Sequence, residues 1–182
     1  MPDSCPAWSL VDLYAGVNSP ALKADVTECL KAAKQLETQW RGQLGELTAN
    51  QLMDVIKSYE TILERLGKVQ SHAQLLFAAN TNDAAIAKHH QSVREVGAEI
   101  GAALLFVELE LAKIDEGRMA VLLKARGLKH FAPWLRRVRA MAPFQLSDEI
   151  EKMIAERSPT GSGAWVRLFD ETTTSMRFGL QG

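Results

Sequence analysis

Residues 48–79 read TANQLMDVIKSYETILERLGKVQSHAQLLFAA and residues 83–114 read DAAIAKHHQSVREVGAEIGAALLFVELELAKI, and these two stretches decide the fold. In each stretch apolar residues recur every seven positions, and other apolar residues fill the half-steps. The two series are Leu52, Tyr59, Leu66 and Ala73, and Ile86, Val93, Ile100, Val107 and Ile114. This spacing is typical of long helices that pack at shallow angles. The connection between them is short, so the sequence predicts an antiparallel helical hairpin.

Further helices are expected before and after this hairpin. Residues 1–18 form a lead-in without helical periodicity, and Ser19 before Pro20 marks the start of a further helix that ends near Gly42. We therefore expect long helices over 19–42, 48–80 and 82–114, shorter helices over 115–173, and the start of a strand over 174–182. The predicted fold is one all-α domain over 1–182, an antiparallel helical bundle built on the long hairpin with shorter C-terminal helices.

Local signals refine these boundaries. Thr48 followed by Gln51 predicts a capping box at the start of the second long helix. Gly127 is expected to close the helix that begins at Asp115, in a left-handed conformation. Ser147 is expected to cap a helix over Asp148–Arg157. Four residues of the preceding helix are expected to face inward: Trp134, Leu135, Val138 and Met141.

Composition excludes several classes of protein. The chain has 182 residues, 24% of them charged, and a formal net charge of -1, so neither nucleic acid nor an anionic membrane is expected as a partner. Two cysteines, Cys5 and Cys29, make no disulfide framework. The N-terminus lacks the features of a signal peptide, and the most apolar run, Ile100–Val107, is too short to span a bilayer. The expected localisation is cytoplasmic.

Residues that carry chemistry are sparse. The zinc-protease pattern His-Glu-x-x-His does not occur, and the histidines are His72, His89, His90 and His130. If the hairpin turns near residue 81, His72 lies opposite His89 or His90, which would form either a two-histidine pocket or simple packing between helices. Packing is the more frequent arrangement, and no carboxylate is placed to act as a third ligand. We expect no catalytic, cofactor-binding or metal-binding residue in this chain.

Three further patterns admit a ligand, although each has a simpler structural interpretation. Arginines at 136, 137 and 139 beside Trp134 suit a phosphate, but also a solvated helix face. Residues 160–163 suit an anion at a helix start, but also a plain connector. Gly97 and Gly101 form a pair of small residues that allows helices to approach closely.

Several stretches resemble one known family, the oligoendopeptidase F group of the thimet-oligopeptidase family of zinc metalloendopeptidases. The most specific are Leu146–Glu151, Ser158–Gly161 and Ala164–Glu171, all near the C-terminal end. The others that are similar to the N-terminal region of that family are Trp8–Tyr14, Leu63–Leu66, Ala73–Ala79 and Phe131–Leu135.

The resemblance implies a part of a larger enzyme. In that family the N-terminal helical region forms one wall of a substrate channel for short peptides, while zinc and the catalytic glutamate belong to a later catalytic domain. That domain is absent here, so this chain alone is expected neither to bind zinc tightly nor to cleave peptides. The expected partners are the missing catalytic domain, which would dock on Trp165, Leu168, Phe169 and Phe178, and oligopeptide substrates. Self-association through the same surface is a further expectation, and the alternative function is a stand-alone helical interaction module without enzymatic activity.

Overall fold

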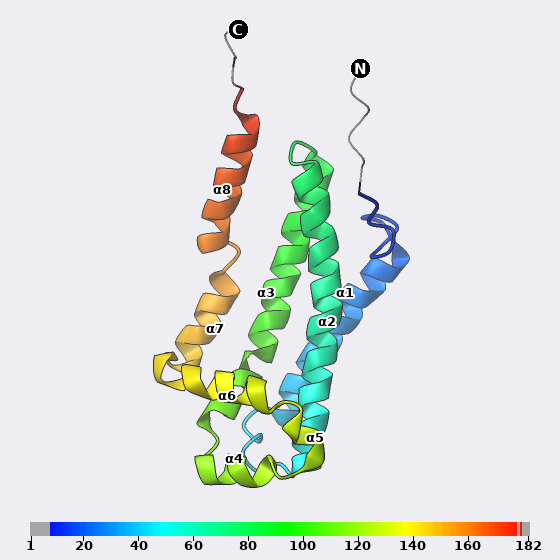
Figure 1. The fold of residues 1–182 in the computed structure, drawn as a ribbon. Coiled ribbons are helices and arrows are strands. Elements are labelled where there is room, and N and C mark those ends of the chain that lie inside the picture. Colours follow the sequence, from blue (N-terminus) through cyan, green and yellow to red (C-terminus); the bar gives the residue numbers. More distant parts are fainter. Residues whose placement is uncertain (1–7, 178, 180–182) are drawn as a thin grey trace.

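All regular structure in the described part of the chain is helical. A computed structural model describes residues 8–177 and 179, and it confirms the predicted all-α class (Figure 1). Three long helices pack together: α1 (Pro20–Trp40), α2 (Ala49–Ala79) and α3 (Ala84–Lys113). The shorter elements are α4 (Glu116–Leu122), α5 (Arg126–Lys129), α6 (Ala132–Met141), the 3-10 turn η1 (Ala142–Phe144), α7 (Asp148–Arg157) and α8 (Ser162–Ser175).

Helices α2 and α3 run in opposite directions along their whole shared length. Near the connecting turn the ring of Phe77 stacks on that of His90, with 4.6 Å between centroids. Toward the other end the Tyr59 hydroxyl donates a hydrogen bond to Glu108 Oε1 at 3.0 Å. Between these contacts Gly97 lies so close to α2 that an added Cβ would fall 2.4 Å from Gln70 Nε2. Glycine at this position therefore leaves room for the Gln70 side chain between the two helices.

The seven-residue series form the core. Leu52, Ile100 and Val107 are completely buried, and most other members of the two series are buried too. Tyr59 and Ile86 are the half-buried exceptions. Each large aliphatic side chain buried in this way contributes about 1.5–3 kcal/mol, so this seam accounts for much of the driving force for folding.

Helices α4, α5 and α6 close one end of the three-helix bundle (Figure 1). Each contributes a leucine to the core, namely Leu122, Leu128 and Leu135, and these side chains are at most 2% exposed. Arg118 connects α4 to the segment before α2 by a hydrogen bond, because its Nη2 donates to the carbonyl oxygen of Leu47 at 2.8 Å. No helix among the described residues is long and apolar enough to cross a membrane.

Helix ends agree with the sequence signals in some places and differ in others. The capping box at Thr48 is confirmed, since Thr48 Oγ1 accepts from the Gln51 amide and Gln51 Oε1 accepts from the Thr48 amide. The side chains of Ser19 and Ser147 make no capping hydrogen bond, although α1 and α7 begin directly after them. Met141, expected to face inward, is 53% exposed, because it lies at the last position of α6, away from the bundle.

Gly127 corrects another expectation. It does not adopt a left-handed conformation but lies inside α5, and the helix from Glu116 already ends at Leu122. A Cβ at Gly127 would fall 2.2 Å from Met53 Sδ, so glycine leaves room for the Met53 side chain where α5 meets α2. Gly127 contacts a residue of another helix, and a rule about helix ends does not include such contacts.

The C-terminal end also differs from the expected strand. Helix α8 continues to Ser175, two residues beyond the predicted end, and Met176 and Arg177 follow without regular structure. Phe178 and Leu180, the rest of that expected strand, lie outside the described residues.

One carboxylate holds the connection between α1 and α2 against α3. Glu110 Oε1 accepts a hydrogen bond from the Gly42 amide at 2.6 Å, and Oε2 accepts one from the Leu44 amide at 3.1 Å. Gly42 has φ +81°, a conformation that glycine adopts without strain. The carboxylate thus satisfies two backbone donors just beyond the end of α1, and Leu44 beside it is completely buried.

Replacing Glu110 should therefore destabilise the bundle. We expect Glu110→Ala to lower the free energy of unfolding by about 2 kcal/mol, because two charge-assisted hydrogen bonds are lost. Urea unfolding followed by circular dichroism measures this change. Glu46→Ala removes an exposed carboxylate from the same connection and should change the value by less than about 0.5 kcal/mol. Equal effects of the two substitutions would contradict the role assigned to Glu110.

Candidate functional site

Helices α7 and α8 follow one another along the outer side of α3 (Figure 1). We call these two helices the C-terminal arm. Helix α7 meets the bundle through its polar side, where Glu151, Lys152 and Ala155 are half-buried. Lys113 Nζ at the end of α3 also pairs with Asp148 Oδ1 at 2.6 Å. The side of α7 that faces the bundle is therefore mainly charged.

Helix α8 also turns its polar side toward α3. Arg94 Nη1 donates to the carbonyl oxygen of Gly163 at 3.2 Å, and Arg167 Nη1 donates to Gln91 Oε1 at 3.3 Å. Asp170, one turn further along, is half-buried. These positions lie three and four residues apart and so belong to one face of the helix.

The apolar side of the arm is turned away from the bundle. On α8, Trp165 is 74% exposed and Phe169 67% exposed, and Leu168 lies on the same face. On α7 the equivalent outward positions are Ile150 and Ile154. Other large apolar side chains exposed between η1 and the end of the arm are Phe144, Leu146, Met153, Val166 and Met176.

The polarity of the arm is thus opposite to that of a helix packed on its own core. An amphipathic helix normally buries its apolar stripe and exposes its polar one. Groups of exposed aromatic and aliphatic side chains are typical of interaction surfaces. The structure brings together Trp165, Leu168 and Phe169 of the predicted docking set, whereas Phe178 lies outside the described residues.

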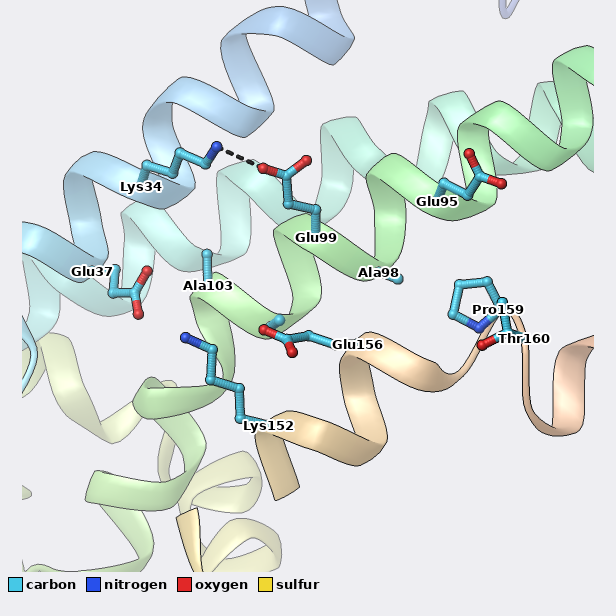
Figure 2. A pocket seen from close by; sticks show the side chains of 11 residues that line it. Lys34, Glu37, Glu95, Ala98, Glu99, Ala103, Lys152, Glu156, Pro159 and Thr160 are labelled. Carbon is cyan, nitrogen blue, oxygen red and sulfur yellow. Dashed lines mark ion pairs between the residues drawn. The ribbon is translucent and has the colours of Figure 1, made fainter. Parts of the chain in front are cut away.

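A cleft of about 520 Å³ separates the arm from the bundle, as Figure 2 shows. Lys34 and Glu37 of α1, Glu99 of α3, and Lys152 and Glu156 of α7 line it. Alanines of α3 form part of the floor. Lys34 Nζ and Glu99 Oε1 are 2.6 Å apart, and both side chains are about half exposed, so this ion pair contributes little to stability. The cleft is lined mainly by charged side chains, and no cysteine, serine or histidine is among its lining residues.

The predicted histidine pair is present between α2 and α3. The rings of His72 and His89 are 6.4 Å apart, whereas His90 stacks on Phe77 and its Nε2 lies 2.9 Å from Gln74 Oε1. His72 is completely buried, and within the described part of the protein neither of its ring nitrogens has a hydrogen-bond partner. No group of three or more histidine, cysteine, aspartate or glutamate side chains that could hold a metal ion occurs among the described residues of the chain.

Burial controls the protonation of these histidines. It lowers the pKa of His72, and the nearby His89 lowers it further. Burial likewise lowers the pKa of His89 and of His90. All three rings therefore favour the neutral form, which suits packing between helices.

The other candidate ligand sites are occupied by structural contacts. Arg136 Nε donates to the Ala132 carbonyl oxygen at 3.2 Å, and Arg139 Nη1 donates to that of Ile114. In the connector before α8, the amides of Thr160, Gly161 and Gly163 all donate to carbonyl oxygens within the turn. Arg136, Arg139 and the amides of Thr160, Gly161 and Gly163 thus make contacts within the fold.

Comparison with known proteins places the C-terminal part of the chain in a family context. Residues 110–178 match the family model described as Oligopeptidase F, in its N-terminal region. The match extends from the end of α3 through the whole arm, and it confirms the resemblance to the N-terminal region of oligoendopeptidase F. No curated protein and no solved structure matches the chain.

Acidification should destabilise the protein through the buried histidines. Their pKa values are lowered on folding, so the unfolded chain binds more protons near and below pH 6.5. The free energy of unfolding should therefore fall as pH decreases below about 6.5, with a slope of at most about 1.4 kcal/mol per pH unit for each histidine. Urea unfolding between pH 8 and pH 5 measures it. His72→Leu should flatten this dependence, and an unchanged slope in this variant would contradict the role assigned to the buried ring.

Attachment of α8 should depend on the absence of a side chain at position 163. A Cβ there would fall 1.9 Å from Arg94 Nη2 and 2.8 Å from the Ser158 carbonyl oxygen. We expect Gly163→Ala to increase hydrogen exchange of the α8 amides about tenfold while the α2 amides keep their protection. Gly101→Ala is the matched control, since no atom lies within 4 Å of the added methyl group. Unchanged exchange in α8 would show that this close contact does not hold the arm.

Proposed function

We propose that this chain is the N-terminal helical domain of a zinc metalloendopeptidase similar to oligopeptidase F, and that it forms one wall of the channel for short peptides. The match of residues 110–178 supports the family. The observation that carries the rest is the outward apolar face of the arm, defined by Ile150, Ile154, Trp165, Leu168 and Phe169. In this proposal a catalytic domain of the same polypeptide covers that face.

The physical basis of docking is the burial of this face. Each large apolar side chain transferred from water into an interface contributes about 1.5–3 kcal/mol when fully buried. Aromatic side chains such as Trp165 and Phe169 are enriched at the energetic centres of interfaces. The polar side of α8 is already bound to α3 through Arg94 and Arg167, which presents the apolar side to the partner.

The chemistry of peptide hydrolysis belongs to the proposed partner domain. The sequence contains no His-Glu-x-x-His pattern, and the described residues hold no metal-ligating cluster. Zinc in the catalytic domain would polarise the scissile carbonyl and activate a water molecule. The part played by this chain is a rigid wall, for which the long α2–α3 pair is well suited. A stand-alone interaction module remains the alternative, because the same apolar face would also bind a separate protein.

The complete reading frame tests the proposal. We expect it to continue into a segment with His-Glu-x-x-His, and we expect the longer polypeptide to cleave a quenched fluorescent peptide. In that polypeptide the α8 amides should exchange at least tenfold more slowly than in this chain alone, because the catalytic domain covers them. A reading frame that ends at Gly182 would refute the proposal in favour of the interaction module.

Substitutions separate docking from general destabilisation. In the longer polypeptide, Phe169→Glu should lower peptidase activity at least tenfold, since a charge on the buried interface displaces the catalytic domain. Val121→Glu places the same charge on a 55% exposed position of α4, outside the arm, and should change the activity less than twofold. Equal effects of the two variants would contradict docking through the arm.

A further inference from the structure

A second concave surface lies between α2 and the α5–α6 region, away from the arm. It is a groove of about 580 Å³, within the size range of ligand pockets. Its α2 side consists of Ile56, Tyr59, Glu60, Leu63 and Glu64. These positions are separated by three and four residues, so they form one continuous strip along the helix. We call this surface the aromatic groove.

Three aromatic rings make up most of the apolar lining. Tyr59 comes from α2, Trp134 from α6, and Phe131 from the residue before α6. The rings of Tyr59 and Trp134 stack at 5.8 Å between centroids with an interplanar angle of 29°. Glu108 of α3 fixes the Tyr59 ring by accepting its hydroxyl hydrogen bond. The lining is therefore held by α3 and does not depend on a ligand for its shape.

The edge of the groove carries two free carboxylates. Glu60 and Glu64 lie one helical turn apart on α2, and both are exposed. Within residues 8–177 neither forms an ion pair, whereas the adjacent Arg65 pairs with Asp25 and Glu28 of α1. The groove thus combines an aromatic surface with two carboxylates that form no ion pair among the described residues, while the positive charge of Arg137 on α6 acts on the nearby Tyr59.

We propose that the aromatic groove binds a peptide segment that carries an arginine next to apolar residues. A guanidinium group is planar, stacks on aromatic rings, and forms paired hydrogen bonds with a carboxylate. In this arrangement the guanidinium lies against Trp134 or Phe131 and is bound by Glu60 or Glu64. The apolar neighbours of the arginine contact Leu63, which is 40% exposed.

Charge complementarity selects this occupant over others. A phosphate or an acidic peptide would be repelled by Glu60 and Glu64. A purely apolar segment would leave these carboxylates without partners, and a compact lysine ammonium would stack less well on the rings. Since the groove lies on α2 and α6, the inference does not depend on the proposed function of the arm.

Peptide binding to the full chain tests this inference. The probe is a fluorescein-labelled octapeptide with a central Leu-Arg-Leu flanked by glycine and serine, and fluorescence anisotropy measures its affinity. A second probe replaces the arginine by citrulline, which keeps the shape and most of the hydrogen-bond donors but removes the charge. We expect the citrulline probe to bind at least tenfold more weakly. Equal affinity of the two probes, or no binding of the arginine probe, would overturn the proposal.

Variants locate the binding surface. Glu60→Gln combined with Glu64→Gln should weaken binding of the arginine probe at least tenfold, and both positions are exposed, so the fold should be retained. Glu46→Gln combined with Glu149→Gln is the matched control, because it removes the same charge from exposed positions elsewhere. The control should bind within twofold of the unaltered chain. If the control weakens binding equally, net charge alone attracts the probe and the assigned groove is wrong.

Discussion

The apolar seam between α2 and α3 is the interaction on which the other parts of the structure depend. Leu52 on α2 and Ile100 and Val107 on α3 are completely buried in one core. The seam brings His72 of α2 opposite His89 of α3. It also places Glu108 and Glu110 of α3 where each can contact a neighbouring segment. From there Glu108 holds the Tyr59 ring, and Glu110 holds the connection after α1. Polar groups far apart in sequence are therefore positioned by the packing of apolar ones.

The C-terminal arm depends on the same seam in a different way. Its contacts with the bundle are polar or charged, as in the Lys113–Asp148 and Arg94–Gly163 contacts. The exposed Lys113–Asp148 ion pair stabilises weakly, whereas the Arg94–Gly163 contact is partly buried and α7 packs along α3. Because polar groups make the contacts with the bundle, the apolar side chains of the arm remain available to another surface. The bundle therefore buries its apolar residues, while the arm meets the bundle through polar groups and leaves its apolar side chains exposed.

Much of the fold was predictable because it follows from local spacing. The seven-residue series predicted α2 and α3 to within a few residues, and the Thr48–Gln51 pair predicted the start of α2. The features that were wrong arise from tertiary contacts. Gly127 lies beside the Met53 side chain of α2, and no rule about helix ends contains that information. Spacing within α8 did predict that Trp165, Leu168 and Phe169 share one face, and that face is exposed because the opposite side of α8 meets Arg94. The aromatic groove joins residues about 70 positions apart, so no local sequence pattern could predict it.

The two proposed surfaces differ in how far the fold has prepared them. The rings of the aromatic groove are stacked and held by a partly buried hydrogen bond from Tyr59, so a ligand would meet an ordered lining. The apolar face of the arm lies on helices that meet the bundle mainly through polar groups, so a partner that buries this face would strengthen the attachment of the arm. Preorganised sites spend less of their interaction free energy on ordering, which suits a small ligand with few contacts. Burial of a large apolar interface can offset the conformational entropy lost when two short helices become ordered. Such an interface is expected where a domain docks on another domain of the same polypeptide.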